Sequence, residues 1–341
     1  MVAGVLEGYW YIACRSRELR QRPLPRTLLG KSVVLFRGPT GQPAALEDRC
    51  AHRNAPLSLG RTVDGQLRCP YHGWRYRVDG ALAEIPALAE EGTVPDDVRV
   101  PSFPCVEQDG YVWVCPRLEK ALVRPLGFPH LGEQGWTSFR MCTRFYAPVE
   151  ACLENFLDCP HASFVHRFWF RTPTGRTVRV IVRALPDGAE AEYFDEPRER
   201  SVVWWTLASK RRRMRHTDRF IAPATTRVDY VFSNGAHYII SSSCTPVSDD
   251  ITDVYTVITF RHHWLGPLIR LFFQPLSRWI IRQDVHILGQ VQNNIARFGG
   301  QDFHGSDADL LTAYIRGWRR AIRDGADPPA AGSEKHVTIR L

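Results

Sequence analysis

Two short clips of metal-ligand residues constrain this chain more than any other feature of its sequence. The first is Cys50-Ala-His52, and the second, after sixteen intervening residues, is Cys69-Pro-Tyr-His72. Thiolates and imidazoles at such spacing bind zinc or an iron–sulfur cluster. Zinc clips usually pair cysteine with cysteine and histidine with histidine, whereas each clip here holds one of each. The mixed clips suit a [2Fe–2S] cluster with two thiolates on one iron and two imidazoles on the other, and tetrahedral zinc is the alternative.

The first third of the chain predicts a small antiparallel β domain around these clips. Its apolar runs are short and are separated by glycine and proline turn signals. These runs cover residues 32–37, 66–69, 74–78 and 111–115. A proline-bearing stretch over residues 116–129 then predicts a linker.

After the linker, the pattern predicts one sizeable antiparallel sheet with helices on its outside. Alternating apolar runs cover residues 177–184, 201–207, 227–232, 237–243 and 254–260. Helical patterns cover residues 149–170, 283–298 and 306–323, the last with Ser306 and Asp309 as a capping pair. Strands followed by outer helices make an α+β pattern.

The two clips and their neighbours resemble one family, the Rieske oxygenase α subunits. The stretch CAHRNAPLSLG…CPYHGWRY resembles the family's C-x-H-R-x-x-P-L and C-P-Y-H-G-W-x-Y motifs. The resemblance implies that Cys50, His52, Cys69 and His72 bind a Rieske [2Fe–2S] cluster. It also implies a Rieske domain over 1–118, a helix-grip-like mononuclear iron domain over 119–330 and a C-terminal tail over 331–341.

A second group of ligand-type residues lies in the segment 154–166, ENFLDCPHASFVH. Asp158 and His161 are about one helical turn apart and share a face. His166 lies about 140° around an ideal helix from His161. Both histidines can therefore reach one metal only if the helix ends or distorts between them, which Pro160 allows. Two unrelated core histidines are the alternative.

This segment resembles the family's N-x-x-D-x-x-H-x₄-H signature. The resemblance implies that His161 and His166 bind a mononuclear Fe(II) and that Asp158 bridges the two metal sites. In the family, that bridge accepts a hydrogen bond from a cluster histidine, here His72, of the neighbouring subunit in a head-to-tail homotrimer. Asn155 is expected near the iron, or else serves as a turn or capping residue.

Two histidines need one carboxylate to complete a facial triad that leaves positions open on Fe(II). The resemblance implies Asp284, because RQDVHILGQVQ is similar to the family's E/Q-D-x-x-x-L segment. Asp302 and Asp309 are weaker alternatives. Asp309 is better used by the helix cap, and Asp302 lacks an apolar helical frame. A solvated helical carboxylate is the plain alternative for Asp284.

The resemblance implies an enzyme that activates O₂ and monooxygenates a small organic substrate, such as an aromatic compound or secondary metabolite, by hydroxylation or oxidative demethylation. Cis-dihydroxylation and non-catalytic electron transfer are the alternatives.

The chain holds no G-x-G-x-x-G fingerprint, so electrons from NAD(P)H are expected through a separate ferredoxin or reductase. The basic run 210–215 either attracts such a carrier or forms a solvated loop. Candidate pocket aromatics, each equally readable as core, are Phe168, Trp204, Trp205 and Tyr255.

Charge and cysteine usage add weaker limits. The net charge is +8, but the 44 basic residues are mostly arginines scattered among 36 acidic ones, which does not favour nucleic-acid binding. Nine cysteines and no secretory-signal pattern predict reduced thiols and a cytoplasmic protein. The apolar stretch 264–281 carries Arg270, Arg278 and two prolines. It predicts a buried or amphipathic helix and no membrane span.

Overall fold

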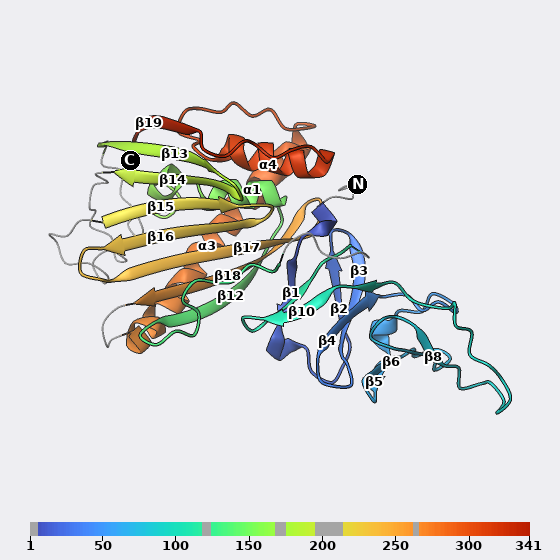
Figure 1. Cartoon of the computed structure of the whole chain (residues 1–341). Helices are drawn as coiled ribbons and strands as arrows, with labels where there is room; N and C mark the ends of the chain where they lie inside the picture. The colour runs from blue at the N-terminus through green and yellow to red at the C-terminus, as the bar shows by residue number, and fades with distance from the viewer. Residues whose placement is uncertain (1–5, 118–123, 168–174, 195–213, 262–265) are drawn as a thin grey trace. The chain divides into compact units, whose positions relative to one another are not determined.

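The computed structural model describes residues 6–117, 124–167, 175–194, 214–261 and 266–341. Contacts divide the chain into two compact units, Met1–Gly127 and Phe128–Leu341 (Figure 1). The division lies close to the boundary expected from the sequence, at the end of the predicted linker. The two units are described separately below.

The first unit is built from small antiparallel sheets, as the short alternating runs predicted. One sheet has the order β1-β11-β10, with β1 (Tyr11–Arg15), β10 (Cys105–Gln108) and β11 (Tyr111–Val114). The second has the order β2-β3-β4-β9, with β2 (Leu24–Leu28), β3 (Lys31–Arg37), β4 (Pro43–Glu47) and β9 (Ser102–Phe103). The third has the order β5-β6-β7-β8, with β5 (Arg61–Val63), β6 (Gln66–Arg68), β7 (Arg75–Tyr76) and β8 (Leu82–Glu84).

The core of this unit extends to the two cysteines of the clips. Phe36, Leu46 and Leu67 are fully buried, and they belong to the same cluster as Cys50 and Cys69. Short strands with one apolar face can bury that face only against another sheet. The β3–β4 and β6–β7 pairs therefore pack over a shared core, and this packing holds the bases of the two clips.

The second unit contains one large antiparallel sheet of eight strands in the described part of the chain. Its order is β12-β18-β17-β16-β15-β14-β13-β19. The strands are β12 (Thr137–Phe145), β13 (Thr177–Leu185), β14 (Gly188–Phe194), β15 (Met214–Ile221), β16 (Thr225–Phe232), β17 (His237–Ser248), β18 (Ile251–Arg261) and β19 (Glu334–Arg340). The strand expected over 201–207 lies outside the described residues. Residues 334–340, expected within a C-terminal tail, pair with β13 at the sheet edge.

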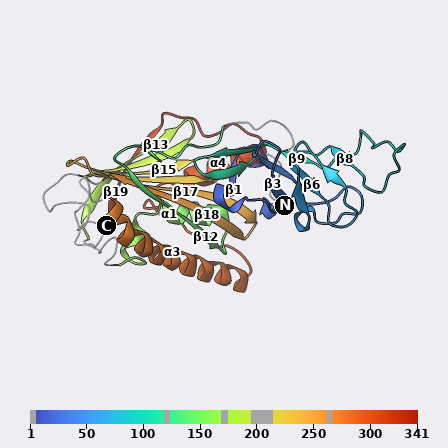
Figure 2. The same cartoon turned by 90° about the horizontal axis from the view of Figure 1, so that it is seen from below.

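Three helices in the described residues accompany this sheet: α1 (Val149–Phe156), α3 (Gly266–Arg297) and α4 (Thr312–Asp324). Helix α3 runs along one face of the sheet (Figure 2). It joins the two helices that the sequence predicted over 264–281 and 283–298 into one and continues through Pro275. Helix α4 begins at Thr312, later than predicted, because Ser306 and Asp309 form a hydrogen-bonded turn ahead of it. No described helix is long and apolar enough to cross a membrane.

Candidate active site

The two clips lie on neighbouring turns of the first unit. Each turn is closed by its own backbone: the Cys50 N–H donates to Ala55 O at 2.9 Å and the Cys69 N–H to Trp74 O at 2.8 Å. The turn after Cys50 needs a left-handed residue, and Asn54 supplies it with φ 57°, a conformation that asparagine tolerates. Because these bonds lie within each turn, the local sequence alone holds the cysteine and the histidine of each clip close together. The spacing within a clip can therefore predict a pair of ligands.

The four clip side chains form two pairs, one of two buried thiols and one of two neighbouring imidazoles. Cys50 and Cys69 are buried, and burial raises the pKa of the Cys69 thiol, with Cys50 as its hydrogen-bonding neighbour. The imidazoles of His52 and His72 lie edge to face with ring centroids 4.6 Å apart. Two thiols at the buried end and two imidazoles at the outer end fit the unsymmetrical ligand set of a Rieske cluster.

Neighbouring aromatic side chains support both pairs. The Tyr76 hydroxyl lies 3.1 Å from Cys50 Sγ and accepts a bond from the Ala51 N–H at 3.2 Å. The Trp74 indole stacks on His52, with ring centroids 4.6 Å apart and planes 4° apart. Hydrogen bonds to a ligating sulfur and packing against a ligating imidazole tune a metal site and orient its ligands.

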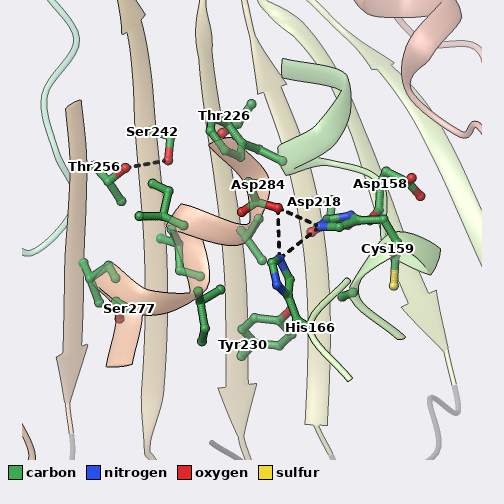
Figure 3. A pocket seen from close by; sticks show the side chains of 18 of the residues that line it. Asp158, Cys159, His166, Asp218, Thr226, Tyr230, Ser242, Thr256, Ser277 and Asp284 are labelled. Carbon is green, nitrogen blue, oxygen red and sulfur yellow. Dashed lines mark hydrogen bonds and ion pairs between the residues drawn. The ribbon is translucent and has the colours of Figure 1, made fainter. Parts of the chain in front are cut away.

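A second group of candidate ligands forms in the other unit, where His161, His166 and Asp284 meet. Figure 3 shows His166 and Asp284 pointing toward each other. The two Nε2 atoms are 3.3 Å apart. Asp284 Oδ1 lies 3.0 Å from His166 Nε2 and 3.6 Å from His161 Nε2. All three ligand atoms lie within 4.8 Å of one another. Two imidazoles and one carboxylate converging on one point match the facial set that holds non-heme Fe(II).

The backbone between the histidines is irregular, as the sequence predicted. Helix α1 ends at Phe156, and a 3₁₀ turn covers Pro160–Ser163. The 3₁₀ turn rotates each residue further about the axis than an α-helix does, so His161 and His166 leave the ideal-helix geometry that would separate them. Asp284 comes from α3, where it is 5% exposed.

Hydrogen bonds on the far side of each imidazole aim the Nε2 atoms at the shared point. His161 Nδ1 donates to the backbone oxygen of Asp158. His166 Nδ1 donates to Gln283 Oε1 at 2.7 Å. A donor at Nδ1 leaves Nε2 unprotonated and available as a ligand. Burial raises the pKa of Asp284, but without a bound metal the two adjacent imidazoles, when protonated at Nε2, lower it to about 2.

The bond from His166 to Gln283 gives a testable prediction. We expect Gln283→Leu to weaken binding of the mononuclear iron by about 10- to 100-fold, because His166 loses the acceptor that fixes its tautomer. Gln283→Glu retains an acceptor and is expected to stay close to the wild-type affinity. Iron chelation curves measure this, with exposed Gln290→Leu on the same helix as the matched control. Equal affinities for Gln283→Leu and wild type would contradict it.

Asp158 lies close to His161, whereas Asn155 lines a different cavity from the one that contains the histidines. Asp158 lines the cavity that contains the histidines, and both residues line a second cavity of about 470 Å³ between α1, α3 and α4. Burial raises the pKa of the Asp158 carboxyl. The Asn155 side-chain nitrogen is buried and has no hydrogen-bond partner among the described residues. The competing carboxylates Asp302 and Asp309 are exposed and not part of the ligand group.

The first cavity has a volume of about 140 Å³ and lies between α3, the turn after α1 and the face of the sheet. Most of its exposed lining surface is apolar, and polar side chains project into it from the sheet, from α3 and from the turn after α1. The lining includes Met141, Phe156, Val228, Ile240, Ile258, Ile280, Ile281, His216, Asp218, Thr226, Tyr230, Ser242 and Thr256. An apolar cavity with few polar groups beside a ligand triad is the expected form of a small-molecule site.

The sequence did not single out the polar wall of this cavity. His216 and Asp218 are two residues apart on β15 and therefore share a face, but the alternating pattern of the strand became visible only once its partners were known. Of the candidate pocket aromatics, Phe168, Trp204 and Trp205 lie outside the described residues. Tyr255 is buried on β18, whereas its neighbour Thr256 lines the cavity.

Comparisons with known proteins agree with this geometry. Residues 9–104 match the Rieske [2Fe-2S] domain, and residues 145–322 match the vanillate O-demethylase oxygenase C-terminal domain. The dicamba O-demethylase oxygenase component of Stenotrophomonas maltophilia is 38% identical over 162 residues, which are 46% of this chain and 47% of that protein. Chlorophyllide a oxygenase of Oryza sativa subsp. japonica is 34% identical over 342 residues, which are 94% of this chain and 58% of that protein.

Solved structures show the same fold. The structure of dicamba monooxygenase bound to dicamba superposes with a TM-score of 0.82 at 22% identity and covers 94% of this chain and 98% of that one. The chain spans less than two thirds of the length of the two curated relatives. The α+β architecture expected from the sequence, a small β domain followed by a large antiparallel sheet with helices, is confirmed.

Proposed function

The chain belongs to the Rieske non-heme iron oxygenases, and from this premise we propose that it monooxygenates a small, aromatic-type organic molecule, by hydroxylation or oxidative demethylation, with O₂ as cosubstrate. One observation carries the proposal: His161, His166 and Asp284 converge at the wall of a cavity of about 140 Å³ whose exposed lining is largely apolar. Relatives named as O-demethylases support the monooxygenase reading.

In this proposal the ligand sets have separate tasks. Cys50, His52, Cys69 and His72 hold the [2Fe–2S] cluster, while His161, His166 and Asp284 hold the mononuclear iron. The iron supplies O₂ activation when it is bound. The chain positions the substrate against the sheet, and its aliphatic walls exclude bulk water from the reacting atoms. Asp158 O and Gln283 Oε1 keep the two imidazoles in the tautomer that binds metal.

The proposed electron path runs through other molecules. We infer a ferredoxin or flavin reductase as donor of NAD(P)H electrons, because the relatives are named as components of multi-component systems. A head-to-tail homotrimer would bring His72 of one subunit to Asp158 of the next. The second cavity gives Asp158 a further exposed side that such a neighbour could reach. None of the nine cysteines is paired in a disulfide, which is compatible with the cytoplasmic location that we propose.

Two alternative functions are distinguished by specific observations. A relative named 3-chlorobenzoate-3,4-dioxygenase, 37% identical over 167 residues, keeps cis-dihydroxylation as a second candidate. A non-catalytic electron carrier would need no mononuclear site, so the converging triad speaks against it.

Metal analysis of the purified holoprotein tests the proposal. We expect a brown protein with three irons per chain, two in the cluster and one mononuclear, because both ligand sets are complete. Two irons per chain would support the electron carrier, and zinc without visible absorption would contradict both readings. Formaldehyde release from a methoxy-bearing aromatic then separates demethylation from ring dihydroxylation.

A further inference from the structure

Asp218, a buried carboxylate on the sheet wall of the cavity, is held in position by two neighbouring side chains. Asp218 is 3% exposed on β15. Its Oδ2 accepts a hydrogen bond from the Tyr193 hydroxyl at 2.9 Å, and its Oδ1 lies 2.9 Å from His216 Nε2. An ionised carboxylate offers about four acceptor positions. These two contacts therefore leave acceptor capacity on the side of Asp218 that lines the cavity.

The imidazole of His216, the partner of Asp218, is held between two stacked aromatic rings. His216 is 1% exposed and lies between two phenol rings, Tyr193 on one side and Tyr230 on the other, each at a centroid distance of 4.3 Å. The interplanar angles are 11° and 18°, so both contacts are stacked. Because strand pairing places these three residues side by side on β14, β15 and β16, the imidazole cannot swing away from Asp218.

This cluster lies in the same cavity as the ligand triad. Figure 3 shows Asp218 and Tyr230 on the strand wall and Asp284 on the helix that faces it. A substrate placed beside the triad is therefore close to the Asp218–His216 pair. On the sheet wall of the cavity, Asp218 and His216 are the two described side chains that can carry a formal charge.

Among the described residues, the side chains of the sheet wall offer an anionic substrate no net positive charge. Even when His216 is protonated, the Asp218–His216 pair carries no net positive charge. At the sheet wall, on the side away from the positive charge that a bound Fe(II) would supply, a substrate carboxylate would lose its hydration and face the Asp218 carboxylate, which is costly at a buried site. A hydroxyl or amine N–H would instead find an acceptor.

We propose that this cavity selects uncharged substrates that present an O–H or N–H donor to Asp218, and that it rejects carboxylated analogues. The inference rests on the proposed function, since it concerns the substrate of the same site. It makes Asp218 a specificity-determining residue, with His216, Tyr193 and Tyr230 as the residues that position it.

Equilibrium binding of three ring compounds of matched shape tests the proposal. The probes are para-methoxyphenol, para-methoxyaniline and para-methoxybenzoate, titrated into anaerobic iron-loaded protein by calorimetry at neutral pH. We expect the phenol and the aniline to bind at least about tenfold more tightly than the benzoate, as one hydrogen bond to a charged group can provide. The order of affinities in the wild-type protein is informative whether or not any variant folds.

The variant Asp218→Asn tests directly whether the Asp218 carboxylate causes the preference for the phenol. We expect the preference for the phenol over the benzoate to shrink by about tenfold, since the amide has no charge to repel an anion and accepts less strongly. Asp250→Asn, an exposed aspartate in the β17–β18 turn, should leave the order unchanged. Equal or tighter binding of the benzoate by wild type, or no binding of any probe, would overturn the inference.

Iron content of the same preparations separates this inference from the proposed function. If the protein holds three irons per chain but binds the benzoate more tightly than the phenol, the inference about Asp218 is wrong and the proposed oxygenase function is unaffected. Two irons per chain with no probe binding would remove both.

Discussion

Asp284→Ala is expected to remove the mononuclear iron and leave the Rieske cluster intact, so the iron content falls from three to two per chain. The reason is that Asp284 supplies the only anion of the ligand group, and two neutral imidazoles alone hold Fe(II) weakly. We expect the affinity for this iron to fall by more than about 100-fold, because losing a direct ligand costs more than losing its hydrogen-bonding support. Metal analysis and the visible spectrum of the cluster report the two sites independently.

Asp302→Ala is the matched control for this experiment. Asp302 was an alternative third ligand in the sequence, and its side chain is 95% exposed. The variant should keep all three irons. Retention of the mononuclear iron by Asp284→Ala, or its loss from Asp302→Ala, would show that the wrong carboxylate has been assigned.

Asp158→Asn is expected to keep both metal sites but to slow turnover by at least about 100-fold. The side chain keeps its shape and loses its charge, so it no longer accepts strongly from the cluster histidine of a neighbouring subunit. His161 remains oriented, because its Nδ1 partner is the Asp158 backbone oxygen and not the carboxylate. In a single-turnover experiment, the chemically reduced cluster should stay reduced when O₂ and substrate are added.

Asp309→Asn controls for the general effect of removing a negative charge from the second cavity, which Asp309 also lines. It should re-oxidise its cluster at the wild-type rate. Full turnover in Asp158→Asn would rule out the bridging role, whereas loss of iron from that variant would show that Asp158 has a structural role instead.

Local sequence could predict most of the ligands, because they lie on short turns. Cys50 and His52 share one turn, and Cys69 and His72 share another, so backbone hydrogen bonds within each turn hold each pair together. Such geometry depends on a handful of neighbouring residues. Asp284 was harder to assign, because it lies far along the chain from the two histidines. Its neighbour Gln283 is separated by 117 residues from His166, to which it is hydrogen-bonded. The choice over Asp302 and Asp309 came from resemblance to a family and not from geometry.

The cavity lining could not be predicted from the sequence. Asp218 and His216 appear as ordinary strand residues, and their role depends on which strands pair with β15 and in which register. A shift of one residue would turn both side chains to the opposite face of the sheet. The sequence predicted helices over 264–281 and 283–298 but not their continuity in α3, because packing against the sheet stabilises a helix through Pro275 that local propensity disfavours.

The sequence by itself determined the chemistry that this chain can hold, since ligand identity and short-range spacing are encoded in the residue types and their local turns. Only the tertiary structure brings Asp284 to His161 and His166, and only the tertiary structure decides which side chains a substrate would meet. Those contacts join strands and helices far apart in the chain, and they exist only after the sheet register and the packing of α3 are set.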